Sequence, residues 1–99
     1  MRLTPAQIDT IKSTAQAVLS EGVQVTLFGS RVNDAANGGD VDLMIEVSQA
    51  LPEPALVSAR IAGRVSRAMH EHKVDVLLKA SNLLEQSIHR IAAQQGVVL

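Results

Sequence analysis

Three aspartates and a Gly-Ser pair are the residues of this chain whose types and spacing could support chemistry. The first apolar run ends in "LFGSR", with Gly29 and Ser30, and the next is "DVDLMIEV", with Asp40 and Asp42. A third run, "KVDVLLK", carries Asp75. Clustered carboxylates bind divalent cations, and a glycine followed by a hydroxyl can hold a phosphate group. The question is whether the fold brings these residues together.

Strand geometry places the first two aspartates on one face. Residues two apart in a strand point to the same side, so Asp40 and Asp42 lie about 6.5 Å apart at their Cα atoms and can converge on one cation. The other face of that strand is apolar and should be buried; it carries Val41, Leu43, Ile45 and Val47. In the third run, Asp75 likewise lies on the outward face, between the apolar residues Val74 and Val76. If the two strands are adjacent, three carboxylates meet on one open face.

Three carboxylates in such close proximity repel one another. Without a counter-ion, the pKa of at least one of them should therefore be raised. A divalent cation relieves the repulsion. Two such ions about 3.5 to 4 Å apart support in-line phosphoryl or nucleotidyl transfer. Oxygen-only ligands favour Mg²⁺, with Mn²⁺ as the alternative, over zinc. Gly29 and Ser30 could then hold the phosphates of a nucleotide, and Arg31 could add positive charge.

A purely structural interpretation exists for each piece. Aspartates on the wet face of a strand are common, and Gly-Ser at a strand end is an ordinary turn. The combination favours a site, because aspartate is depleted from strand interiors and three of them stand in phase here. The histidines have no metal-ligand spacing and are expected at the surface or at helix ends; they are His70, His72 and His89. The arginines at 60, 64 and 67 are expected on a solvated helix face, with a partner or phosphate contact as the alternative.

The elements that must position the site alternate in hydrophobic period. Thr4, Pro5 and Gln7 form an N-cap, a first-turn proline and a capping-box partner. The expected elements are, in order, a helix from residue 5, strands over residues 23–28 and 40–47, a helix over 55–71 and a strand over 73–79. A last helix, capped by Asn82 and Glu85, follows and carries Leu84, Ile88 and Ile91. A short edge strand is expected at 97–99. This α-β-β-α-β-α order predicts a single α+β domain over residues 1–99, with a small mixed sheet of three to four strands and helices packed on one face.

Composition narrows the function classes. The chain has 99 residues, 46% of them hydrophobic and 19% charged, a formal net charge of -1, one Phe, and no Tyr, Trp or Cys. The slightly negative net charge and the single aromatic residue argue against nucleic-acid binding. The lack of cysteine excludes disulfides and thiol chemistry. No apolar run approaches the roughly 20 residues that span a bilayer, which makes the cytoplasm the expected location and a membrane role unexpected.

Taken together, "LFGSR", "DVDLMIE" and "KVDVLL" resemble the motifs of the nucleotidyltransferase superfamily that includes DNA polymerase beta and kanamycin nucleotidyltransferase. The length and the closing "GVVL" are most similar to its minimal nucleotidyltransferases. The resemblance implies the nucleotidyltransferase fold. It also implies that Asp40 and Asp42 ligate two Mg²⁺ ions, and that Asp75 completes the acceptor-side metal site and helps to deprotonate the attacking hydroxyl. Gly29 and Ser30 would hold the β- and γ-phosphates of ATP.

Members of this minimal group are often encoded beside a HEPN-domain protein as toxin and antitoxin, and some transfer AMP from ATP to a tyrosine of that partner. The resemblance therefore implies a protein adenylyltransferase with a HEPN-type partner. The alternative is an antitoxin or regulatory module that neutralises its partner by docking, without catalysis. A homo-oligomer is left open by the sequence.

Overall fold

The computed structural model describes residues 2–20, 22–32 and 39–99. Its elements are α1 (Pro5–Leu19), β1 (Gln24–Phe28), the 3-10 helix η1 (Gly29–Val32), β2 (Val41–Glu46), α2 (Pro54–Ala68), β3 (Val74–Lys79), α3 (Ser87–Gln95) and β4 (Val97–Val98). The four strands form one mixed sheet in the order β3-β2-β1-β4. The predicted α+β class and element order are confirmed, including the short closing edge strand. The stretch "NDAANGG", residues 33–39, is dense in turn-forming residues and predicts a connection between the first two strands, but residues 33–38 lie outside the described residues.

Strand pairing brings the candidate residues together at one end of the sheet. β1 and β2 are antiparallel, with Phe28 opposite Asp42. β2 and β3 are parallel, with Asp42 opposite Asp75. The connection through α2 is what allows β3 to run parallel to β2, because a parallel neighbour needs a long crossover. The two aspartate-bearing strands are therefore neighbours, which is the condition that the sequence left open.

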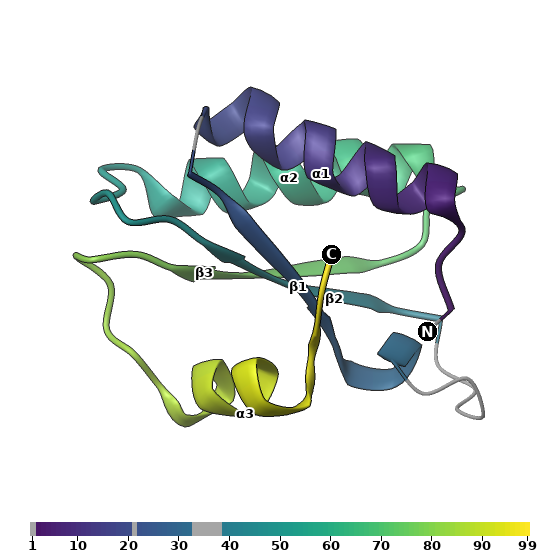
Figure 1. Cartoon of the computed structure of the whole chain (residues 1–99). Coiled ribbons are helices and arrows are strands. Elements are labelled where there is room, and N and C mark those ends of the chain that lie inside the picture. Colours follow the sequence, from purple (N-terminus) through teal and green to yellow (C-terminus); the bar gives the residue numbers. More distant parts are fainter. Residues whose placement is uncertain (1, 21, 33–38) are drawn as a thin grey trace.

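The sheet is covered on both faces. α1 and α2 lie side by side on one face, whereas α3 lies across the other (Figure 1). The main core, between the sheet and the α1–α2 layer, includes Ile11, Ala15, Val25, Leu27, Val41, Leu43, Ile45, Ile61 and Val65. On the opposite face Thr26, Met44 and Ala92 are also buried. The expectation that all helices pack on one face therefore does not hold for α3. Met44 explains the difference, since an apolar side chain on the second face needs its own cover.

The predicted start of α1 is confirmed in detail. Thr4 Oγ1 accepts a hydrogen bond from the Gln7 amide at 3.1 Å, and Gln7 Oε1 accepts from the Thr4 amide at 2.9 Å. α2 is shorter than the predicted helix over residues 55–71 and ends at Ala68. The sequence spacing predicts that Ala68 faces inward, but it is exposed. His70 and Glu71 follow with positive φ angles of 57° and 62°, and this left-handed backbone stops the helix.

The start of α3 differs from the prediction. Asn82 does not cap a helix; its side-chain amide bonds both backbone groups of Leu51, each at 2.8 Å. An amide side chain has one acceptor and two donors, so it can satisfy a buried backbone unit in this way. α3 begins five residues later, at Ser87, where the Gln86 amide donates to Nδ1 of His89 at 2.9 Å.

α3 rests on the sheet through a polar side chain. His89 is 5% exposed, and its Nε2 lies 2.9 Å from the Leu78 carbonyl oxygen. Because Nδ1 accepts from Gln86, the proton sits on Nε2, which donates to Leu78. The apolar residues that gave the helix its sequence pattern remain exposed: Leu84 at 81%, Ile88 at 43% and Ile91 at 48%.

Candidate active site

Asp42 and Asp75 form the centre of the candidate site. They are direct register partners on the parallel strands β2 and β3, and the charge of Asp75 acts on Asp42. Asp42 is half-buried and Asp75 is exposed. The two carboxyl groups thus share one place on the sheet face that α3 only partly covers.

The electrostatics of this pair are unfavourable without a counter-ion. Burial, which disfavours the charged form, is the largest cause that raises the pKa of Asp42 above the ordinary aspartate value, followed by the charges of Asp75 and Asp40 and by the hydrogen bond with Asp75. The charge of Lys73 acts in the opposite direction. The prediction that at least one carboxyl pKa is raised is therefore confirmed, and Asp42 is the residue concerned.

Gly29 packs directly against the Asp42 carboxylate. Its φ of +78° lies in the left-handed region, which other residues rarely adopt. A Cβ at this position would overlap Oδ2 of Asp42 and lie 3.1 Å from its Cγ. Only glycine therefore lets the end of β1 approach the carboxylate so closely. The glycine that sequence reasoning assigned to phosphate binding also sets the space in which Asp42 sits.

Ser30 and Arg31 lie in η1, directly after β1. Ser30 is half-buried, and its carbonyl oxygen accepts a hydrogen bond from Arg2 Nη2 at 3.2 Å. Arg31 donates to the carbonyl oxygens of Arg2 and Gly39 at 2.9 Å and 3.0 Å. η1 is therefore close to the aspartates, but the guanidinium of Arg31 already has backbone partners. A contact between Arg31 and phosphate stays a prediction.

The third aspartate is less closely held. Asp40 is exposed and precedes β2 by one residue, although its charge reaches Asp42. Within residues 2–20, 22–32 and 39–99, no group of three His, Asp or Glu side chains is arranged to hold a metal ion. The structure therefore brings Asp42 and Asp75 together, while Asp40 would have to turn toward them to complete a three-carboxylate set. The chemistry of the donors still fits Mg²⁺ or Mn²⁺, since a cation offsets the like-charge repulsion that raises the pKa of Asp42.

Lys73 lies beside the candidate site but was not among the residues predicted from the sequence. Its Nζ lies 3.8 Å from Oδ2 of Asp75. Period two in a strand would have placed Lys73 and Asp75 on the same face, so the signal was present. This exposed pair contributes little to stability, but it balances part of the negative charge of the cluster.

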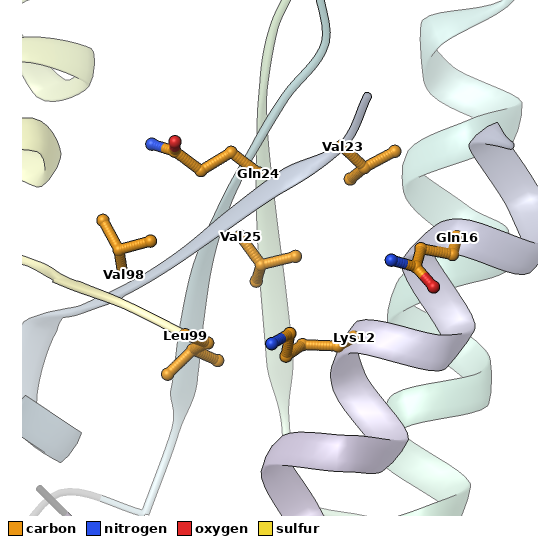
Figure 2. A pocket seen from close by; sticks show the side chains of 7 residues that line it. All are labelled: Lys12, Gln16, Val23, Gln24, Val25, Val98 and Leu99. Carbon is orange, nitrogen blue, oxygen red and sulfur yellow. The ribbon is translucent and has the colours of Figure 1, made fainter. Parts of the chain in front are cut away.

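A cavity elsewhere in the molecule is separate from these residues. It has a volume of about 330 Å³ and is lined by Lys12, Gln16, Val23, Gln24, Val25, Val98 and Leu99, from α1 and the β1–β4 edge of the sheet (Figure 2). None of the candidate site residues lines it.

No family model matches this chain, and no curated protein matches it. The functional assignment therefore depends on the residues and geometry described above. In the described part of the chain, no helix has the length and apolar character needed to cross a membrane.

The raised pKa of Asp42 predicts a pH dependence of stability in the metal-free protein. The folded protein binds the Asp42 proton more tightly than the unfolded chain, so the contribution of this group to the free energy of unfolding falls as pH rises from about 4 through the folded pKa. Urea denaturation in EDTA should be compared between wild type and Asp42→Asn at each pH. The excess stability of the variant should grow across this window and then level off. A difference that is constant from acid to neutral pH would contradict the raised pKa.

Proposed function

We propose that this protein is a metal-dependent nucleotidyltransferase that moves AMP from ATP to a hydroxyl group of a protein partner. The observation that carries the proposal is the register pairing of Asp42 with Asp75, with Gly29 packed against the Asp42 carboxylate. The resemblance of the three motifs to minimal nucleotidyltransferases supports the same reaction class. Under this proposal the natural acceptor is a tyrosine hydroxyl of a HEPN-type partner, in a toxin-antitoxin pair.

The chain's own residues have separate roles in this mechanism. Asp42 and Asp75, with Asp40 turned toward them, would hold Mg²⁺, which supplies charge stabilisation at the transferred phosphoryl group. Gly29 and Ser30 orient the β- and γ-phosphates. Asp75 accepts the proton of the attacking hydroxyl while the hydroxyl oxygen forms a bond to the α-phosphorus. The bond from the α-phosphorus to the bridging oxygen breaks, and pyrophosphate leaves.

Label transfer tests this function. The purified protein is incubated with Mg²⁺, ATP labelled at the α-phosphate, and lysate of its own host, beside an Asp42→Asn sample and a sample with EDTA. The expected result is a labelled protein band that requires both the metal and Asp42. Label that persists in the Asp42→Asn sample would contradict the proposed site, and γ-label transfer in place of α-label transfer would contradict the reaction class.

A second candidate function is favoured by the surface of α3. Ile88 and Ile91 of α3 are exposed, as is Leu84 in the segment before it. α3 itself lies on the sheet face opposite α1 and α2 (Figure 1), the face that Asp42 shares with Met44. Such a surface suits a docking module that neutralises a partner by binding it. In that case the affinity for a co-purifying partner would be unchanged by Asp42→Asn and by chelation, and no label would be transferred. An enzyme that modifies its partner must also bind it, so only transfer separates the two candidates.

A further inference from the structure

Arg31 joins two parts of the backbone that are far apart in sequence. Its Nη1 donates to the carbonyl oxygen of Arg2 at 2.9 Å, and its Nη2 donates to that of Gly39 at 3.0 Å. Gly39 is the residue immediately before Asp40. One guanidinium therefore connects the turn after β1 to the residue that precedes the first candidate metal ligand.

The N-terminal segment holds this turn from the other side. The Arg2 amide donates to the Arg31 carbonyl oxygen at 2.8 Å, and Arg2 Nη2 donates to the Ser30 carbonyl oxygen at 3.2 Å. The Nε atom of Arg31 is buried. Arg31 thus lies packed between backbone segments, with its position fixed by bonds in both directions.

We propose that Arg31 is a positioning residue that holds the backbone of Gly39, and through it the backbone of Asp40, at the start of β2, from where the Asp40 side chain can turn toward Asp42. The inference rests on the proposed function, because it gives Asp40 its role as a metal ligand. Arginine is suited to this task, since its planar fork can donate to two carbonyl oxygens at once in a fixed geometry. A lysine would keep the charge at this point but lose the two-point connection.

This role differs from direct phosphate binding in what it predicts. A residue that contacts the nucleotide acts on the affinity for ATP and leaves the metal-free protein unchanged. A residue that positions Asp40 acts on the backbone at Gly39 and Asp40 before any ligand is present, and then on metal affinity. Residues that support metal ligands typically change that affinity by about 10- to 100-fold.

The test is Arg31→Lys, with Arg64→Lys on the exposed side of α2 as the matched control. Backbone amide order parameters are measured by NMR in the metal-free protein, and Mn²⁺ affinity is then measured by calorimetry. In Arg31→Lys we expect lower order at Gly39 and Asp40, no change at Leu43, an unchanged Tm, and Mn²⁺ binding weakened by about tenfold. Arg64→Lys should match wild type in every measurement.

The outcomes separate this inference from the proposed function. Unchanged order at Gly39 and Asp40 in Arg31→Lys would overturn the positioning role, most clearly if the KM for ATP rose instead. Looser backbone at these two residues, in a protein whose wild type binds no Mn²⁺, would support the positioning role and overturn metal-dependent transfer. Loss of order throughout the sheet would show a general structural role and would also overturn the inference.

Discussion

Asp42→Asn should abolish nucleotidyl transfer while making the metal-free protein more stable. Transfer should fall by about a thousandfold or more, because one charged ligand at the centre of the cluster is lost and the developing charge is no longer stabilised. Stability should rise because the wild-type carboxylate is half-buried beside two like charges. The substitution keeps the shape of the side chain and removes the charge. The measurements are initial rates of label transfer and the Tm in EDTA.

The matched control is Asp9→Asn, which removes the same charge from an exposed position on α1. It should leave both the rate and the Tm close to wild type, because surface substitutions usually change stability by less than about 0.5 kcal/mol. Asp42→Asn with a lowered Tm would show that the carboxylate stabilises the fold, contrary to its raised pKa. A variant with undiminished transfer would remove Asp42 from the mechanism.

The expected opposition is that one substitution lowers activity and raises stability, as is typical of charged groups at active sites. A stabilised variant that loses activity is a common result at active sites. In this chain the expected opposition would have an identifiable source, since parallel pairing of β2 and β3 places Asp42 directly opposite Asp75. A shift of register by one residue would separate the carboxylates but would turn the apolar side chains of the strand outward. The hydrophobic pattern of the core therefore enforces the repulsive pair.

The positions of the strands could be predicted because their period-two patterns are strong. Val41, Leu43 and Ile45 define the buried face of β2 unambiguously, and the aspartates follow on the other side. The α1 start could be predicted because its capping box uses neighbours in sequence. The adjacency of β2 and β3 was left open by the sequence, because nothing local to either strand names its neighbour in the sheet.

The contacts that depend on distant residues could not be predicted. Asn82 has the spacing of a helix cap, yet its amide is taken by Leu51, 31 residues away. The apolar residues of α3 predict that a different side of this helix is buried. The side that faces the sheet instead carries His89, which bonds to the Leu78 carbonyl oxygen. The Arg31 bonds to Arg2 and Gly39 belong to the same class. Local spacing gives each of these side chains an alternative partner, and only the assembled fold decides between them.

Gly29→Ala should damage the site through two separate effects. The first is backbone strain of about 1 to 2 kcal/mol, because a φ of +78° is unfavourable for alanine. The second is displacement of the Asp42 carboxylate, whose Oδ2 would overlap the new Cβ. A misplacement of about 1 Å in a catalytic group can cost about 100-fold in rate. Label transfer and urea denaturation measure the two effects independently.

Gly22→Ala separates these effects, because Gly22 has a similar φ angle but no side chain packed against it. Gly22 has a φ of +75°, and a Cβ there would meet nothing within 4 Å. This variant should lose the same conformational stability as Gly29→Ala and keep its rate of transfer. The difference in rate between the two variants then measures the contact with Asp42 alone. Equal rates would mean that the carboxylate can move aside without consequence, and the close packing of Gly29 against Asp42 would then have no part in catalysis.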